Sequence, residues 1–115
     1  MKRWLAATLA LGLLVAAPGW GQDAVVVLQE TRVPEPGKKK AIRHMAVLKN
    51  TSVRPLRGLR VTVELYDYFG TLLWARTAVP VPSSLGPGAT ATLSLTMPDL
   101  PAHRTTKYRF QHRPP

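Results

Sequence analysis

The fold is decided by the stretch Leu59-Arg60-Val61-Thr62-Val63-Glu64-Leu65-Tyr66, in which apolar and polar residues alternate. Successive side chains of a strand point to opposite faces, so the apolar members of this stretch gather on one side. A helix would scatter them around its circumference. Residues 59–66 therefore predict a strand that packs one face on a core and turns the other face, with Glu64, toward water.

Residues 91–97 repeat this pattern, with hydroxyl-bearing residues between their apolar ones. Four further strands are predicted over residues 24–33, 42–50, 71–81 and 105–112. In the second of these four, His44 shares a face with apolar neighbours, and we expect it to be half-buried. The phase of residues 71–81 stays open, because Trp74 and its neighbours compete for the core.

Turn-forming residues separate these segments, and no stretch after residue 21 carries an apolar stripe at helical spacing. Helix content should be near zero. Six or seven short strands in about 100 residues are typical of an immunoglobulin-like antiparallel β-sandwich with Greek-key connections. A partly open barrel of the oligonucleotide-binding kind is the competing all-β fold. We favour the sandwich, with residues 22–115 as its single domain.

Residues 1–21 have the three zones of a secretory signal peptide. Lys2 and Arg3 precede an uncharged run, residues 4–17, which is too short to cross a hydrocarbon core of about 30 Å as a helix. Gly19 and Gly21 supply the small residues that a signal peptidase requires. We expect cleavage after Gly21 and export to the periplasm or the medium, with no stable membrane span in the mature chain; an uncleaved anchor is the alternative.

The chain contains no cysteine and carries 16 Lys and Arg against 6 Asp and Glu. The lack of cysteine excludes a thiol enzyme, a disulfide scaffold and a cysteine-ligated zinc site. The exported domain therefore has to fold by burial alone, for which about 55–65 residues already suffice. Without Lys2 and Arg3, 14 basic residues face 6 acidic ones, which leaves a formal net charge of +8.

Residues 46–97 resemble the FxLYD-domain family of small exported prokaryotic modules. The resemblance is carried by Leu48-Lys49-Asn50-Thr51-Ser52, Pro55-Leu56, Val63-Glu64-Leu65-Tyr66-Asp67 with Gly70, and Leu85-Gly86-Pro87-Gly88 before Thr90 and Leu93. The leading Phe of the family motif is Val63 here, which keeps an apolar residue facing the core.

The resemblance implies an exported immunoglobulin-like sandwich in a family whose biochemical role is mostly unassigned. The motif residues are then architectural, in order along the chain: Asn50 ends a strand, Leu65 and Tyr66 complete the next, Asp67 and Gly70 make a hairpin, and Pro87 and Gly88 make a turn. The family pattern offers no catalytic residue, and similarity of fold does not transfer function.

No residue pattern predicts catalysis, a cofactor or a metal site. None of the serines lies in a Gly-x-Ser-x-Gly elbow. The acidic residues form no recognisable acid–base pair, because Asp67 is explained by its turn and Glu30 lies near the end of a strand. His44 and His112 lie on strands that could be neighbours, but the spacing of the three histidines matches no known metal site. We therefore predict a protein that is not an enzyme.

The basic residues fall in a run between the first two strands, a cluster around the next connection, and the C-terminal strand. They are our candidate polyanion-binding residues: Lys38, Lys39, Lys40, Arg54, Arg57, Arg60, Arg104, Lys107 and Arg109. A solvated surface whose lysines protect sheet edges is the alternative interpretation. Exposed aromatics beside the cations would help to bind single-stranded nucleic acid. The available ones are Tyr66, Tyr68, Phe69 and Trp74, far in sequence from the lysine run.

Two functions are left open. The first is a non-enzymatic exported module that binds a protein partner or supports envelope structure, with sheet edges and loops as its contact surface. The second is electrostatic binding of an anionic envelope polymer or extracellular nucleic acid through the basic loops. No particular partner, cofactor or oligomeric state is predicted.

Overall fold

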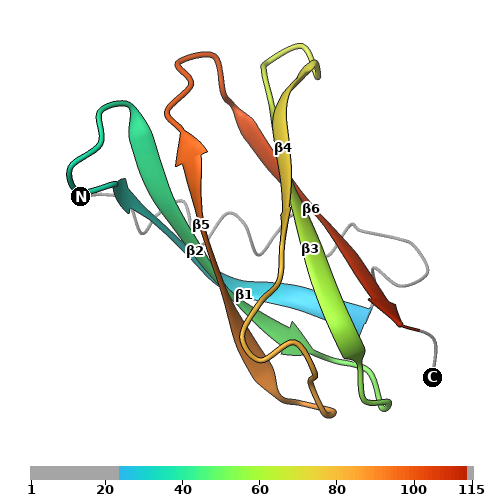
Figure 1. Cartoon of the computed structure of the whole chain (residues 1–115). Helices are drawn as coiled ribbons and strands as arrows, with labels where there is room; N and C mark the ends of the chain where they lie inside the picture. Colours follow the sequence, from blue (N-terminus) through green and yellow to red (C-terminus); the bar gives the residue numbers. More distant parts are fainter. Residues whose placement is uncertain (1–23, 114–115) are drawn as a thin grey trace.

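The computed structural model describes residues 24–113, which form six antiparallel strands (Figure 1). They are β1 (Val25–Pro34), β2 (Ala41–Asn50), β3 (Arg57–Tyr66), β4 (Leu72–Ala78), β5 (Thr90–Pro98) and β6 (Thr105–Arg113). Every predicted strand is present. The predicted signal peptide, residues 1–21, lies outside the described residues. Within the described part of the chain, no helix has the length and apolar character that crossing a bilayer requires.

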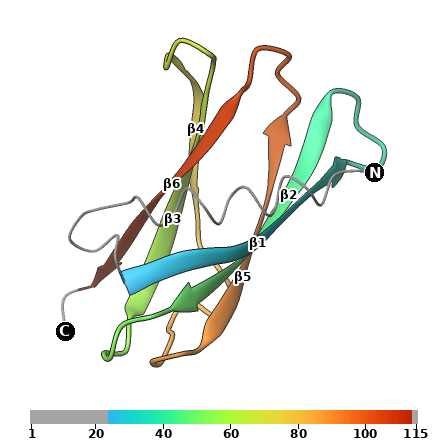
Figure 2. The same ribbon diagram turned by 180° about the vertical axis from the view of Figure 1, so that it is seen from behind.

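The strands form two three-stranded sheets, with the orders β1-β2-β5 and β4-β3-β6 (Figures 1 and 2). The chain changes sheet after β2, after β4 and after β5. Because β2 pairs with β5 in one layer and β3 with β6 in the other, the connections have the Greek-key order of an immunoglobulin-like sandwich. The prediction of a sandwich is confirmed, and two separate sheets exclude the barrel.

The core between the sheets is built from every second residue of the strands. Leu59, Val61, Val63 and Leu65 of β3 are fully buried, and Leu93 of β5 faces them from the other layer. A fully buried Leu or Val side chain contributes about 1.5–3 kcal/mol relative to an exposed one. The prediction that the apolar residues of 59–66 pack one face of a strand on the core is thus confirmed.

The open phase of the fourth strand is settled by its packing. Trp74 and Ala78 pack against the core from β4, and Trp74 pairs with Leu65 of β3. Trp74 is therefore a core residue and does not belong to an exposed aromatic surface.

The first strand changes its inward-facing positions half-way along its length. The register of β1 against β2 shifts between Val27 and Gln29, which leaves Leu28 as an extra residue in β1. Before this bulge, Val25 and Val27 are buried in the core. After it, Glu30 and Arg32 point toward the other sheet, where they contact side chains of β6. The second half of β1 thus contributes polar side chains to the space between the layers.

Buried Asn50 joins two connections at one end of the sandwich. Its Nδ2 donates to the carbonyl oxygens of Arg54 (2.8 Å) and Leu85 (3.0 Å), and its Oδ1 accepts from the backbone nitrogen (2.9 Å) and hydroxyl (2.7 Å) of Ser52. The Asn50 carbonyl accepts from Gly88 N (2.8 Å). Gly88 belongs to a turn of residues 86–89, in which Pro87 and Gly88 occupy the central positions and the glycine has φ +78°. One amide side chain thus ties the β2–β3 connection to the β4–β5 connection.

Candidate functional site

The β3–β4 hairpin ends in a tight turn that displays two aromatic side chains. Asp67 Oδ1 accepts hydrogen bonds from Phe69 N (2.8 Å) and Thr71 N (2.9 Å), and Asp67 O accepts from Gly70 N (3.1 Å). Gly70 has φ +83°, a conformation that glycine adopts without steric cost. Tyr68 and Phe69 occupy the tip, 80% and 85% exposed, with their ring centroids 5.2 Å apart in an edge-to-face arrangement.

Two other connections lie beside this hairpin. Arg104 N donates to Tyr66 O (2.8 Å), and Asp99 N donates to Lys40 O (2.9 Å). The connection 99–104 is thus bonded to Tyr66, the last residue of β3, and to the connection 35–40, and both connections lie at the same end of the sandwich as the hairpin turn, residues 67–71 (Figures 1 and 2). We call the three segments together the loop end.

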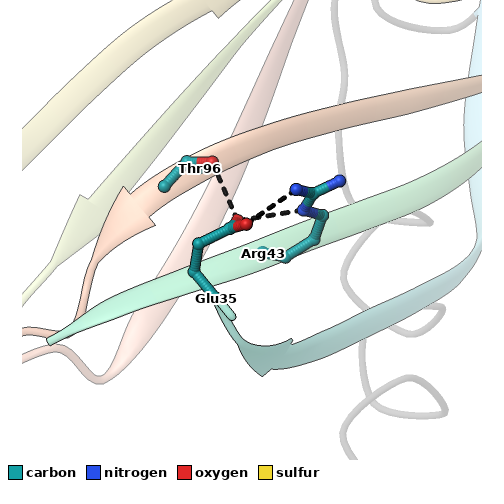
Figure 3. A network of polar contacts seen from close by, with 3 residues as sticks. All are labelled: Glu35, Arg43 and Thr96. Atoms are coloured by element: carbon teal, nitrogen blue, oxygen red, sulfur yellow. Dashed lines mark hydrogen bonds and ion pairs between the residues drawn. The ribbon is translucent and has the colours of Figure 1, made fainter. Parts of the chain in front are cut away.

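An ion pair on the outer face of the first sheet fixes the base of the first connection (Figure 3). Arg43 Nε and Nη2 donate to the two carboxylate oxygens of Glu35 at 2.9 and 2.7 Å, and Thr96 Oγ1 donates to Glu35 Oε1 at 3.1 Å. The bond from Arg43 lowers the pKa of Glu35 below its ordinary value. The loop that carries the lysine run is thereby anchored to β2 and β5.

The nine candidate polyanion-binding residues fall in three places. The lysine run and Arg104 lie at the loop end, exposed. Arg54 and Arg57 lie at the opposite end, in the β2–β3 connection and at the start of β3. The other three lie on the outer face of the second sheet: Arg60, Lys107 and Arg109. The structure therefore does not form one polyanion surface from all nine.

The outer face of β3 and β6 has a single acidic residue among its described positions. Glu64 is only 8% exposed, because Tyr66 OH donates to its Oε1 (2.8 Å) and Arg109 Nε lies 3.1 Å from its Oε2. Lys107 Nζ covers the Tyr66 ring, 4.8 Å from its centroid. Glu64 does lie on the outward face, but the prediction that it meets water is wrong, because the cations of β6 cover it.

A groove lies where β3 begins and β6 ends. Its described lining includes Arg60 and Ser83 on one side and Arg109, Gln111 and Arg113 on the other. None of the described lining residues is acidic. Hence this part of the second sheet concentrates positive charge at a concave place.

A chain of polar side chains connects the two sheets between β1, β2 and β6, and we call it the inter-sheet network. Its members are Glu30, Arg32, His44, His103, Thr106 and Tyr108. Arg32 Nε donates to His44 Nδ1 (3.1 Å), and Tyr108 OH donates to Glu30 Oε2. Because His44 Nδ1 accepts, the proton of the neutral ring lies on Nε2, which donates to the Tyr108 oxygen at 2.6 Å. Each of these three hydrogen bonds therefore has one donor and one acceptor.

The second half of the network joins Arg32 to His103 through Thr106. Arg32 Nη2 donates to Thr106 Oγ1, and the same hydroxyl is hydrogen-bonded to His103 Nε2 (2.9 Å). Burial lowers the pKa of His44 to about 3, and the positive charge of Arg32 acts in the same direction. Burial likewise lowers the pKa of His103 and raises that of Tyr108. Both imidazoles are thus held neutral.

Three expectations about these residues are wrong. His44 is fully buried rather than half-buried. Glu30 lies in the middle of β1 rather than near its end. The strands of His44 and His112 are not neighbours, because β2 and β6 belong to different sheets, and Tyr108 is the β6 residue that meets His44. The network could not be predicted from the sequence because the bulge in β1 reverses which residues of that strand point inward.

The network contains acid–base groups, but their hydrogen bonds are directed to one another and His44 has no exposed surface. We therefore assign the inter-sheet network a structural role, which is to join the two sheets. Among residues 24–113, no three His, Asp or Glu side chains gather in a metal-binding cluster.

Comparison with known proteins gives a likeness of fold. No family model and no curated protein matches the chain. The solved structure of IrmA from Escherichia coli is similar, with a TM-score of 0.56 and 18% identity over 72% of this chain and 71% of that one. A DUF1425 family member from Shewanella sp. pv-4 gives a TM-score of 0.44 and 11% identity over 79% and 80%. This chain thus shares its architecture with a small bacterial β-domain, and its membership of the FxLYD-domain family stays a prediction.

Proposed function

We propose that the chain is an exported, non-enzymatic binding module of the FxLYD type that contacts another component of the cell envelope through its loop end. The observation that carries the proposal is the pair Tyr68 and Phe69, 80% and 85% exposed at the tip of a hydrogen-bonded turn. Export is supported by the three zones of residues 1–21.

Exposed aromatic side chains at a fixed position favour binding over mere solvation. The exposed rings of Tyr68 and Phe69 would gain free energy if a partner buried them. Aromatic residues are also enriched in protein interfaces. The bonds to Asp67 hold the turn before any partner arrives, which reduces the conformational entropy lost on binding. The hydrogen bonds of the inter-sheet network, by contrast, are directed to its own members, and its His44 ring is fully buried.

The absence of cysteine allows a direct test in cells. A Thr71→Cys variant keeps both rings and carries the only thiol of the chain, exposed in the same turn. Its labelling by a membrane-impermeant maleimide is compared in intact envelopes and in the purified protein. We expect labelling to be at least about fivefold slower in envelopes, because the partner covers the tip. A Val53→Cys variant is the matched control, since Val53 is 88% exposed in the connection at the opposite end. Equal labelling of the Thr71→Cys variant in both samples would refute the proposal.

A second candidate function rests on the groove of the second sheet. Three arginines line it, Arg60, Arg109 and Arg113, and none of the described lining residues is acidic, although Glu64 pairs with Arg109. This excess of cations supports binding of an anionic polymer. The test is elution from heparin of the triple variant Arg60→Gln, Arg109→Gln and Arg113→Gln. A matched variant replaces Lys38, Lys39 and Lys40 by Gln and removes the same charge. Elution at clearly lower salt for the groove variant than for the matched one supports this function, and equal shifts contradict it.

A further inference from the structure

We infer that the loop end docks on an anionic lipid surface, with Tyr68 and Phe69 entering the headgroup region and the neighbouring basic residues contacting lipid phosphates. The inference rests on the proposed function and names its partner. It depends on the placement of an aromatic tip and two loops with basic residues at one end of the sandwich, where the loop 99–104 is hydrogen-bonded to Lys40 and to Tyr66, the last residue of β3.

The shape of the site favours a lipid surface over a protein. The two rings project from the tip of a hairpin, with Leu72 half exposed behind them. A stable protein interface buries about 800 Å² on each partner, usually around a packed centre. A convex tip with two rings instead matches an interfacial anchor, since aromatic side chains prefer the boundary between hydrocarbon and headgroups.

The charge around the tip favours anionic lipids. Lys38, Lys39, Lys40 and Arg104 are exposed in the other two connections of the loop end. Of the three acidic residues at this end, Glu35 is bound by Arg43, Asp67 accepts from the amides of its own turn, and Asp99 is exposed, so the four cations remain in excess. Long basic side chains next to an apolar anchor give the two signals, apolar and electrostatic, that stable binding to a membrane surface requires.

The test uses residues 22–115, which contain all six strands and the core between them. The purified protein is mixed with vesicles of phosphatidylcholine alone or with about 30% phosphatidylglycerol. We expect cosedimentation with the anionic vesicles and little with the neutral ones. Replacing Lys38, Lys39 and Lys40 by Gln should weaken binding by about fivefold for each lysine, and Phe69→Ser by about tenfold or more.

Matched variants at the opposite end separate a directed contact from general attraction. The triple variant Lys49→Gln, Arg54→Gln and Arg57→Gln removes the same charge as the lysine variant, and Val53→Ser removes an equally exposed apolar side chain. Both should bind at most about twofold more weakly than the parent. A loss as large as that of the loop-end variants would overturn the inference. A cooperative thermal transition confirms that each variant is folded.

A Phe69→Trp variant reports insertion directly. Its added emission should shift to the blue with anionic vesicles, whereas that of Val53→Trp should not shift. An unshifted Phe69→Trp spectrum, or no binding to either vesicle, overturns the lipid inference. If the Thr71→Cys variant is nevertheless protected in envelopes, the partner is a protein and the proposed function stands; if it is not protected, both fail.

Discussion

At the residue scale, one buried amide side chain, that of Asn50, joins two connections of the fold. Asn50 donates two hydrogen bonds and accepts two through its side chain while fully buried, and its partners lie in two different connections. The sequence assigned it only the end of a strand. Its second role could not be predicted, because the carbonyl of Leu85, 35 residues away, meets it only after the sheets have packed.

An Asn50→Asp substitution tests this role. A carboxylate cannot donate to the carbonyls of Arg54 and Leu85, so oxygen would face oxygen in a buried place. We expect the free energy of unfolding to fall by about 3 kcal/mol or more, measured by urea denaturation. Asn50→Ser, which keeps one donor, should cost less. A loss below about 1 kcal/mol for Asn50→Asp would contradict the assignment.

His44 makes stability depend on pH. Its pKa in the folded protein is about 3, below the ordinary 6.5, so the unfolded chain binds a proton at this site that the native state does not. Stability is therefore complete above about pH 6.5 and decreases as the pH falls toward 3, by roughly 1 kcal/mol for each pH unit. Urea denaturation between pH 7 and 5 measures the slope. A His44→Gln variant should show a clearly shallower decrease, and an equal slope would show that His44 is not the cause.

At the element scale, the strands could be predicted because burial of one face forces a period of two. The inward-facing residues of the stretch 59–66 keep that period throughout, and residues 91–97 in the other sheet do the same. The second half of β1 could not be assigned in this way. One extra residue, Leu28, moves Glu30 and Arg32 to the inward face, and a bulge depends on pairing with β2 rather than on local preference.

The β3–β4 hairpin allows a prediction about its turn. An Asp67→Ala substitution removes the acceptor of two backbone hydrogen bonds, from Phe69 N and Thr71 N. We expect a loss of about 1 kcal/mol in the free energy of unfolding, from urea denaturation. Phe69→Ala in the same turn should change stability by less than about 0.5 kcal/mol, since its ring is in water. A larger effect of Phe69→Ala than of Asp67→Ala would show that the ring, and not the turn, stabilises the hairpin.

At the scale of the whole molecule, the fold rearranges the charges that the sequence groups together. Arg54, Arg57 and Arg60 are close in sequence, yet they extend from a connection onto the outer face of a sheet. The lysine run and the aromatic tip are far apart in sequence, yet the connection 99–104 joins them at one end. Such neighbourhoods follow from the order in which strands alternate between sheets, which a list of strands does not contain.

The location of the contact surface is tested most directly by nuclear magnetic resonance of residues 22–115 during titration with small bilayers that contain phosphatidylglycerol. Backbone amide signals of residues 38–40, 67–71 and 99–104 should shift or broaden first, with those of the groove around Arg60 and Arg113 unchanged at the same lipid concentration. Changes confined to the groove, with the hairpin tip unaffected, would contradict the assignment of the loop end as the surface through which this protein acts.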